Sequence, residues 1–337
     1  MKLSIITINY NSSKETIELL KSLSNQADKN FKIIVVDNAS EEADFNRLQE
    51  FVHTTSFNDG GIQLVKNNEN LGFSGGNNVG IHQALQNGSE WVILLNNDTW
   101  AEKDFVERLG AVLRGKDGVV GIPLVEENHK SPQYQSEARY GAQQITNHKQ
   151  IVYCGQVQWL KPTLKHVYSI KNQVLRKRKN KNQILNTKYL ILNTRFYAIG
   201  GAMAVHKDVF DKIGLLDEKY FLYFEDADFS VRARKVGFDT SIASPPTGGL
   251  NVHHHVSSSA KKLGSPMLLR YHYRNALYFN LKNGPWYIKL LVWPWSWIIV
   301  IKQFIKVAIK QNVEQSKAIL NGVRDFYKNK FGRVVDF

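Results

Sequence analysis

Two groups of residues have the types and the spacing of metal ligands. Asp98 closely follows the apolar segment Trp91–Leu95. Hard divalent cations prefer oxygen ligands, commonly carboxylates together with phosphates, so Asp98 suits a reaction that releases a diphosphate. It could equally be the N-cap of the next helix. In the run His253-His254-His255, an extended backbone puts the first and third histidines on one face and His254 on the other. This run fits a metal site or a solvated turn.

A carboxylate cluster has the spacing of a general base. Glu225, Asp226 and Asp228 follow the aromatic segment Phe221–Phe224. Acidic residues at a helix N-terminus can simply complement the helix dipole. Carboxylates this close also raise the pKa of one of them, and aromatic neighbours remove water. Both effects favour a base that accepts a proton from a substrate.

The loops after the first apolar segments lack the usual phosphate-binding motifs. Residues 9–13 contain neither Gly-x-Gly-x-x-Gly nor Gly-Lys-Ser/Thr, which argues against NAD-dependent chemistry and phosphate-loop hydrolysis. Asp37 ends the second apolar segment, where it could accept a hydrogen bond from a nucleobase N–H. The glycine-rich segment Asn70–Asn78 either lets the backbone approach a ribose or phosphate closely or only opens a helix.

Apolar and amphipathic segments alternate over the first 125 residues and predict the elements that position these side chains. The predicted strands are Leu3–Ile8, Lys32–Val36, Ile62–Val65 and Trp91–Leu95. The predicted helices are Lys14–Leu23, Ala43–Val52, Asn77–Gln86 and Glu102–Leu113. This alternation indicates an α/β fold whose parallel sheet is covered on both faces and binds ligands beyond the carboxyl ends of its strands. Asn9, Asp37 and Asp98 are therefore expected at one edge.

The second half of the chain is less regular. Residues 126–195 are polar, apart from strand-like pieces such as 151–159. Regular structure returns with an apolar segment at 196–205, a helix near 206–212 and a helix over 225–235. The last 70 or so residues are predicted to be mostly helical.

The composition is that of a globular protein with unevenly placed positive charge. The 337 residues include 44 Lys and Arg against 30 Asp and Glu, a formal charge of +14. Nine basic and no acidic residues fall in 161–188, and 14 basic and three acidic residues fall in 261–337. The single cysteine, Cys154, excludes an intramolecular disulfide and a zinc site with several thiolates. Because the first apolar run is too short for a signal peptide, we expect a cytoplasmic protein.

The basic C-terminal segment is typical of membrane interfaces. Four of the seven tryptophans fall between residues 286 and 297, and lysines follow at 302, 306 and 310. The uncharged run Leu290–Ile301 is shorter than the roughly 20 residues needed to span a bilayer. We expect a helix lying on an anionic membrane at its cytoplasmic face, the alternative being a helix packed on the protein. Nucleic-acid binding is disfavoured, because no recognised motif occurs and tryptophan beside isoleucine favours lipid.

Four motifs occur in a fixed order. They are Asp37-Asn-Ala-Ser40, Asn70-x-Gly-Phe-Ser-Gly-Gly-Asn-Asn78, Leu95-Asn-Asn-Asp98-Thr99 and Asp217-Glu-x-Tyr-Phe-Leu-Tyr-Phe-Glu-Asp-x-Asp228. Together they resemble the family 2 glycosyltransferases of the glycosyltransferase-A fold, especially the bacterial rhamnosyltransferase-like branch, over about residues 1–280. The resemblance implies a Rossmann-like, mostly parallel sheet in a catalytic domain over 1–260, with a nucleotide-binding half 1–125 and an acceptor half 126–260. A helical extension over 261–337 follows.

The resemblance also implies site residues, a nucleotide-sugar donor, a divalent metal (Mg²⁺ or Mn²⁺) and inversion at the anomeric carbon. Donor contacts are expected from Asn9, Asp37, Asn38, Gly76, Asn77 and Asn97. Asp98 and His253 are expected to hold the metal, and Asp226 to be the catalytic base. The residues expected near the acceptor or the diphosphate are Glu225, Asp228, His255 and Arg274.

Two departures from the family pattern narrow the reaction. The Asp-x-Asp metal motif reads Asn96-Asn97-Asp98, which leaves one carboxylate. The Gln-x-x-Arg-Trp signature of processive synthases is absent, which favours the addition of one or a few sugars. We expect transfer of L-rhamnose from dTDP-rhamnose to a lipid-linked glycan in cell-surface polysaccharide synthesis. A UDP-sugar carrying galactofuranose or N-acetylhexosamine is the alternative, and a homodimer is compatible with the sequence.

Overall fold

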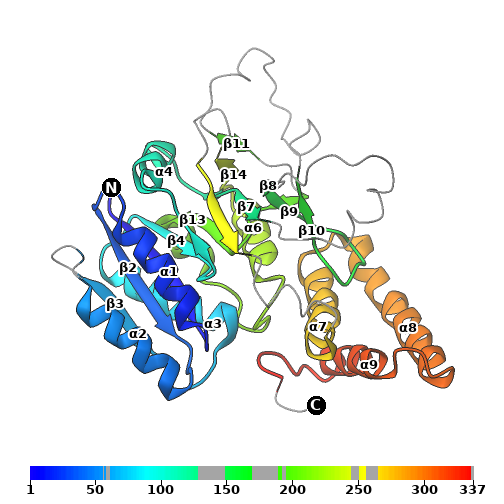
Figure 1. Ribbon diagram of the computed structural model, residues 1–337. Helices are drawn as coiled ribbons and strands as arrows, with labels where there is room; N and C mark the ends of the chain where they lie inside the picture. The colour runs from blue at the N-terminus through cyan, green and yellow to red at the C-terminus, as the bar shows by residue number, and fades with distance from the viewer. Residues whose placement is uncertain are drawn as a thin grey trace, which may run out of the picture.

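A mostly parallel sheet organises the protein. The computed structural model describes residues 1–55, 57, 61–127, 149–168, 189–191, 195–243, 250–255 and 265–334. In this part of the chain the main sheet has eight strands in the order β11-β14-β6-β13-β4-β1-β2-β3 (Figure 1). Their bounds are β1 Leu3–Asn9, β2 Phe31–Asp37, β3 Ile62–Lys66, β4 Trp91–Leu95, β6 Val119–Gly121, β11 Tyr189–Ile191, β13 Ala202–His206 and β14 Thr240–Ala243. The four strands β4-β1-β2-β3 are parallel, and β13 runs antiparallel to both of its neighbours.

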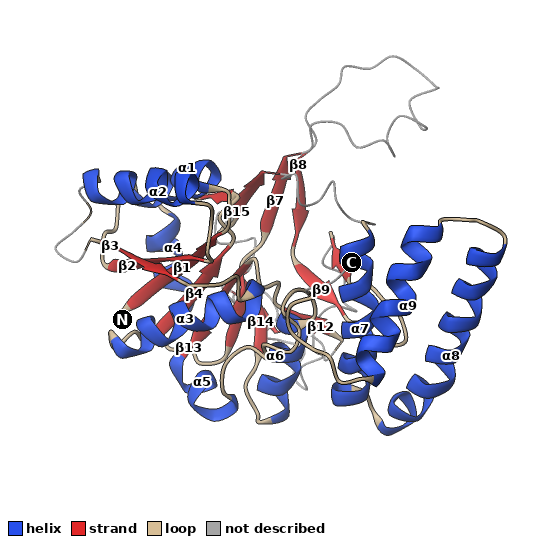
Figure 2. Cartoon of the chain, turned by 90° about the horizontal axis from the view of Figure 1, so that it is seen from below, coloured by secondary structure: helices blue, strands red, loops and turns tan. Residues whose placement is uncertain are grey.

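Helices cover both faces of this sheet, as predicted (Figure 2). They are α1 Ser13–Ser24, α2 Glu42–Thr54, α3 Gly72–Gln86, α4 Phe105–Leu113, α5 Lys207–Ile213 and α6 Glu225–Lys235. Successive residues of a strand point to opposite faces, so Ile5 joins the core under α1, α2 and α4, whereas Ile6 joins the core under α3, α5 and α6. The apolar face of α1, with Leu19 and Leu23 fully buried, covers the first of these cores.

From Gly72 onward, the glycine-rich segment forms the first two turns or so of α3 and not a loop. The helix begins at Gly72, five residues before the predicted start, and its glycines let it approach the rest of the protein closely. A Cβ at Gly72, where φ is +70°, would lie 2.5 Å from the carbonyl oxygen of Phe221. A Cβ at Gly80 would lie 2.5 Å from the side chain of Ile6 in β1. The glycines therefore serve helix packing.

Two smaller sheets complete the second half of the chain. One contains β5 Thr99–Trp100, β7 Leu124–Glu127, β8 Lys149–Val152 and β15 Val252–His255. The other contains β9 Cys154–Gln156, β10 Lys165–Val167 and β12 Phe196–Tyr197. The antiparallel pairing of β15 with β5 sets His254 opposite Thr99 and so brings the histidine run next to Asp98. From residue 169 onward, the basic segment 161–188 lies outside the described residues.

Three helices form the predicted C-terminal extension (Figure 1). They are α7 Pro266–Asn283, α8 Trp286–Ala308 and α9 Val313–Tyr327. Leu277 of α7 shares a core with Val292 of α8 and Ile319 of α9. On its other side α7 packs Phe279 against Phe224 at the start of α6, so this helix belongs to both parts of the molecule.

Candidate active site

A cavity of about 480 Å³ lies at the carboxyl ends of β1, β2 and β4, the edge at which open α/β sheets bind ligands. The strand ends, the start of α3, the loop before α6 and the start of α7 form its walls. The lining residues are Ile8, Tyr10, Ser12, Asn38, Asn70, Gly72, Phe73, Asn77, Leu94, Leu95, Asn96, Asn97, Asp98, Gly200, Phe221, Leu222, Tyr223, Met267 and Leu268.

The structure places His254, and not His253, beside Asp98. Nε2 of His254 lies 3.3 Å from Oδ2 of Asp98. The ring of His253 points to the other face of β15, where it stacks on Trp100 with the ring centroids 3.9 Å apart and lies 3.3 Å from Glu102. The predicted pair of Asp98 and His253 is therefore corrected to Asp98 and His254, because strand alternation separates the two histidines.

Asp98 also controls the charge of its histidine neighbour. Burial alone lowers the pKa of His254, but the hydrogen bond and charge of Asp98, together with the charge of Glu126, raise that pKa above its ordinary value. A carboxylate beside an imidazole fits a divalent cation that takes its other ligands from phosphate oxygens. In the described ranges, no three His, Cys, Asp or Glu side chains converge on one point. The side chain of His255 lies outside what the structure describes.

Asn9 and Asp37 lie beneath the cavity wall and not in it. Both are fully buried, and the register of β1 and β2 pairs them. Nδ2 of Asn9 donates to Oδ1 of Asp37 at 2.9 Å and to Oδ2 of Asp44 at 2.9 Å, and the amide of Ser40 donates to Oδ2 of Asp37 at 3.1 Å. Their polar atoms are used inside the protein, and the contacts of these two residues with base and ribose stay predictions. Tyr10, which is 45% exposed, and Ser12 are the residues after β1 that line the cavity.

Asn38 lines the cavity and holds the start of α3. Its Oδ1 accepts the amide N–H of Leu71 at 3.1 Å, and its Nδ2 donates to the carbonyl oxygen of Gly72 at 3.0 Å. Gly76 faces the protein instead, since a Cβ there would lie 3.0 Å from Ile8 and 3.2 Å from Nδ2 of Asn38. The predicted donor contact of Gly76 is therefore replaced by helix packing.

Asn77 and Asn97 reach the cavity as predicted donor-side residues, and the fold fixes both. Nδ2 of Asn77 donates to the carbonyl oxygen of Phe73 at 2.9 Å. Nδ2 of Asn97 donates to Oγ of Ser12 at 2.7 Å. Their remaining acceptor atoms are the ones that the cavity can offer to a ligand.

The loop before α6 presents Asp226 next to the cavity. Phe221, Tyr223 and Phe224 adopt left-handed backbone angles, with φ of +60°, +70° and +76°. Such angles cost roughly 1–3 kcal/mol each in a residue other than glycine and persist only where the surroundings impose them. Asp226 then lies in the first turn of α6, where Oδ2 accepts the amide N–H of Gly200 at 3.0 Å. Gly200 lines the cavity, and Asp226, which is not itself a lining residue, lies directly behind it.

The surroundings of Asp226 raise its pKa into the range that suits a general base. Burial raises the pKa of Asp226 to about 6, although the amides of Gly200 and Ala227 act in the opposite direction. Burial and the charge of Asp226 raise the pKa of Glu225 well above its ordinary value. Asp226 is thus mostly ionised at neutral pH, and its pKa is close enough to that pH for it to accept a proton efficiently.

Asp228 is a structural residue and is not available to an acceptor or a diphosphate. It is fully buried at the base of α6. Its two oxygens accept hydrogen bonds from Nε of Arg232 at 2.7 Å and from Nδ2 of Asn283 at 2.6 Å, and Nζ of Lys282 lies 2.9 Å away. The prediction for Asp228 is therefore wrong, because two cations and an amide compensate its charge inside the protein.

Arg274 is likewise buried and braces the loop before α6. Its guanidinium donates to the carbonyl oxygens of Tyr220 at 3.1 Å and Gly332 at 2.8 Å. The adjacent Asn275 donates through Nδ2 to the carbonyl oxygens of Tyr220, Leu222 and the following tyrosine, at 2.9, 2.8 and 3.1 Å. The predicted role of Arg274 near the diphosphate is corrected, since its Nη donors are directed at main-chain oxygens and its Nε donates to Oδ1 of Asn275.

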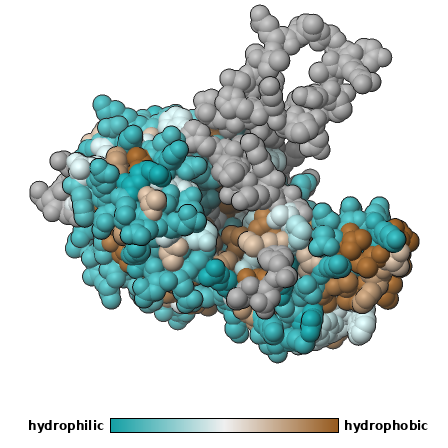
Figure 3. Space-filling model, turned by 60° about the horizontal axis from the view of Figure 1, so that its bottom comes forward, coloured by the Kyte–Doolittle hydropathy of each residue, from teal (hydrophilic) through white to brown (hydrophobic). Residues whose placement is uncertain are grey.

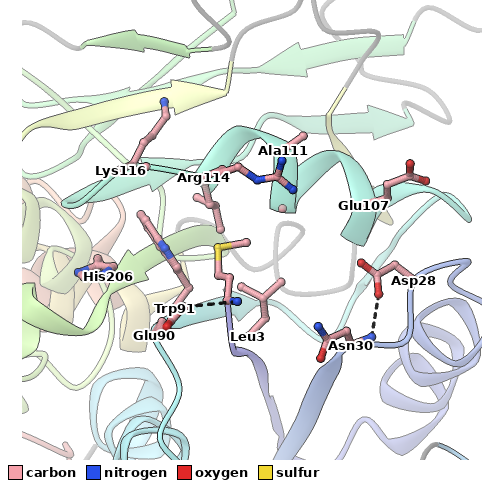
Figure 4. Close-up of a pocket in the computed structure, with 14 residues that line it drawn as sticks. Leu3, Asp28, Asn30, Glu90, Trp91, Glu107, Ala111, Arg114, Lys116 and His206 are labelled. Carbon is pink, nitrogen blue, oxygen red and sulfur yellow. Dashed lines mark hydrogen bonds and ion pairs between the residues drawn. The ribbon is translucent and has the colours of Figure 1, made fainter.

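A second cavity, of about 670 Å³, lies at the amino ends of β1 and β4 (Figure 4). Helix α4 forms its other wall. Its charged side chains are of both signs, namely Asp28, Glu90, Glu107, Arg114 and Lys116. It lies at the edge opposite the one where open α/β sheets bind ligands, so the first cavity is the candidate active site.

The sequence did not point to the cavity residues that come from the second half of the chain, on the loop before α6 and on α7. Phe221 and Leu222 belong to an aromatic segment that it used only as a source of desolvation. Met267 and Leu268 of α7 carry no chemical signal at all. His253 was chosen over His254 because the strand that pairs with β15, and with it the face of the histidine run that meets Asp98, was unknown.

Known proteins that resemble this chain are glycosyltransferases. Residues 4–214 match the family model for glycosyl transferase family 2. The low-salt glycan biosynthesis hexosyltransferase Agl10 of Haloferax volcanii is 26% identical over 234 residues, which cover 69% of this chain and 62% of that relative. The dTDP-rhamnosyl transferase RfbF of Shigella flexneri is 19% identical over 285 residues, which cover 82% of this chain and 79% of that protein. The chain thus spans less than two thirds of the length of Agl10.

Solved structures share the fold. GalNAc-T7, crystallised with UDP, GalNAc and Mn²⁺, superposes with a TM-score of 0.60 at 16% identity, over 84% of this chain and 49% of that one. A fragment of S. aureus TarS in complex with UDP-GlcNAc gives a TM-score of 0.51 at 16% identity, over 97% and 81% of the two chains. These likenesses show the glycosyltransferase-A fold. With a family model matching more than half of its length, the chain belongs to glycosyl transferase family 2.

Proposed function

We propose that this glycosyltransferase moves L-rhamnose from dTDP-rhamnose to a hydroxyl group of a lipid-linked glycan in cell-surface polysaccharide synthesis. The observation that carries the proposal is a single cavity bordered on one side by Asp98 with His254 and on the other by Asp226 behind Gly200. A base and a cation-binding pair at one cavity are what an inverting displacement of a diphosphate requires.

The chain's own residues account for the proton transfer. The carboxylate of Asp226 accepts the proton of the acceptor hydroxyl while the hydroxyl oxygen bonds to the anomeric carbon of the sugar. The bond from that carbon to the diphosphate oxygen breaks, and the nucleoside diphosphate leaves with the electron pair. Attack from the opposite side inverts the configuration, so one carboxylate suffices. Asp98 and His254 would hold Mg²⁺ or Mn²⁺, which when bound supplies positive charge next to the leaving diphosphate.

The choice of donor is supported by one of the relatives. RfbF is named a dTDP-rhamnosyl transferase and matches most of both chains. A second candidate is a UDP-sugar carrying galactofuranose or N-acetylhexosamine. It is favoured by the UDP in the GalNAc-T7 structure and the UDP-GlcNAc in the TarS structure.

A nucleotide screen with the full chain tests the proposal. The thermal unfolding midpoint is measured with dTDP, UDP or GDP, each with Mn²⁺ or with EDTA, and transfer is then assayed from dTDP-rhamnose to a bacterial lipid extract. We expect dTDP with Mn²⁺ to give the largest rise in the midpoint, by the linkage of binding to stability. Asp98→Ala should lose the Mn²⁺-dependent part, whereas Asp211→Ala, an exposed carboxylate of α5, should keep it. A response to UDP alone would select the second candidate, and no response to any nucleotide would reject both.

A further inference from the structure

Helix α8 presents a wholly apolar face to the outside of the molecule. Its inner seam, which shares a core with α7 and α9, is formed by Ile288, Val292, Ser296, Ile299 and Gln303. The residues of the opposite face are each 57% to 63% exposed, namely Leu290, Trp297, Ile301, Phe304 and Ile305. The helix is the outermost element of its lobe in two views (Figure 1, Figure 2), and apolar surface gathers on this lobe (Figure 3).

The charged residues of helix α8 are all lysines. Helix α8 contains no acidic residue. At about 100° per residue, Lys289 and Lys302 fall on opposite flanks of the apolar face, and both are exposed. Of the three lysines that follow the tryptophans, Lys302 and Lys310 are exposed, and Lys306 is half-buried toward the seam. Trp286, 74% exposed, opens the helix. An apolar face with lysines on both flanks and tryptophan at its edge matches the headgroup boundary of an anionic bilayer.

We propose that the outer face of α8 docks this enzyme onto an anionic membrane, with the helix axis parallel to the surface. The inference goes beyond the proposed function, because it concerns a surface outside the cavity and does not depend on the donor sugar. A second copy of the chain fits this face less well, since a two-fold contact would bring the same lysines together. Anionic headgroups would instead neutralise them.

The same helix is long and apolar enough to cross a bilayer by length and composition, and it is the one such helix among the described residues. Its inner seam is nevertheless occupied. The hydroxyl groups of Ser296 and Tyr327 of α9 lie 2.6 Å apart, and α9 is itself joined to α7 by an ion pair of 2.6 Å between Arg270 and Asp325. Crossing the bilayer would break these contacts or carry ion pairs into lipid, whereas lying flat buries only the outer face.

Vesicle flotation of the full chain tests the proposal. The vesicles contain phosphatidylcholine alone or an equal mixture with phosphatidylglycerol, at about 0.1 M and 0.5 M NaCl. The protein should float with the mixed vesicles, less at high salt but still measurably, because the apolar contribution is not screened. Trp297→Glu with Ile301→Glu should reduce the bound fraction by at least about tenfold, whereas the matched pair Trp297→Phe with Ile301→Leu should bind nearly as the parent does.

Charge variants and a measurement on the unaltered protein complete the test. Lys289→Glu with Lys302→Glu should weaken binding to mixed vesicles severalfold, whereas Lys21→Glu, a change at an exposed lysine of α1, should not. Brominated lipids should quench tryptophan fluorescence of the parent protein. The proposal is overturned if the parent protein does not float, or if the variant with Trp297→Glu and Ile301→Glu floats as well as the parent. Resistance to alkaline carbonate extraction overturns it in favour of a spanning helix. If the parent protein does not bind vesicles but forms a dimer, and Trp297→Glu with Ile301→Glu dissociates that dimer, the proposal is overturned in favour of a second copy.

Discussion

The two sides of the active-site cavity are held in place by different means. On the nucleotide side, the register of β1 and β2 brings Asn9 next to Asp37, and the hydrogen bonds that fix this edge come from the first hundred residues. On the acceptor side, the loop before α6 is held by Arg274 and Asn275, which lie on a helix about 50 residues further along the chain. The nucleotide side thus follows from the order of neighbouring strands, whereas the acceptor side depends on hydrogen bonds from a helix far away in the sequence.

This difference shows why neighbouring residues of one motif have separate tasks. Asp226 and Asp228 are two positions apart on α6. The first accepts an amide N–H from the cavity wall, and the second is surrounded by Arg232 and Lys282. Because α7 supplies Lys282, the same helix that braces the loop also determines that Asp228 cannot act on a substrate.

The largest expected effect separates catalysis from donor binding. Asp226→Asn keeps the size of the side chain but removes the base, so kcat should fall by about 10²- to 10⁴-fold while nucleotide affinity stays within about twofold. Steady-state kinetics and calorimetric nucleotide titration measure the two quantities. If kcat stays near that of the parent at saturating substrates, the base is another residue, and Glu225 is the next to test.

The pH dependence of the same residue gives an independent readout. Burial raises the pKa of Asp226 to about 6, and only its ionised form accepts a proton. We therefore expect kcat to fall as the pH decreases below about 6, approaching tenfold per pH unit. Residual activity of Asp226→Asn should lack this acid limb. If the activity of the variant still falls in the same way at low pH, the titrating group is a residue other than Asp226.

Asp228→Ala should act on stability more than on chemistry. Removing this carboxylate takes the anionic partner from the half-buried Arg232 and leaves Lys282 paired with Asp217 alone. The free energy of unfolding should fall by about 3 kcal/mol, the lower end of the range for a broken buried ion pair. Chemical denaturation measures the loss, and Asp211→Ala on exposed α5 is the control. A variant with parental stability but no activity would return Asp228 to the catalytic machinery.

The secondary structure of the nucleotide side could be predicted from the sequence, because local patterns determine it. The four N-terminal strands occur where the apolar pattern placed them, as does the helix over 225–235 on the other side. Strand-end position did not reveal that Asn9 and Asp37 are satisfied inside the protein, which depends on Ser40 and Asp44 across the turn. The acceptor side could not be predicted, since the pairing of β15 with β5 and the brace from α7 join segments far apart in sequence.

Separate substitutions of the adjacent residues His253 and His254 test the pairing of β15 with β5. His254→Ala removes the side chain beside Asp98 and should weaken Mn²⁺-dependent nucleotide binding by about tenfold. His253→Ala removes a ring stacked on Trp100 and should change that binding by less than about twofold, with a small loss of stability. Nucleotide titrations with Mn²⁺ and with EDTA make the comparison. The reverse order of effects would restore His253 as the ligand.

The smallest expected effect tests the brace itself. Asn275→Ala touches no substrate but leaves the carbonyl oxygens of Tyr220, Leu222 and Tyr223 without their shared donor. We expect the free energy of unfolding to fall by about 1–3 kcal/mol. Asn275 donates to the carbonyl oxygen of Tyr223, whose backbone is left-handed, so without this hydrogen bond we expect Asp226 to be positioned less well. The kcat should then fall severalfold while donor affinity is retained. Gln311→Ala, an exposed amide beyond α8, is the control for both measurements. A variant that loses stability but keeps the parental kcat would show that the loop holds Asp226 without the brace. The two sides of the cavity would then be equally local in origin.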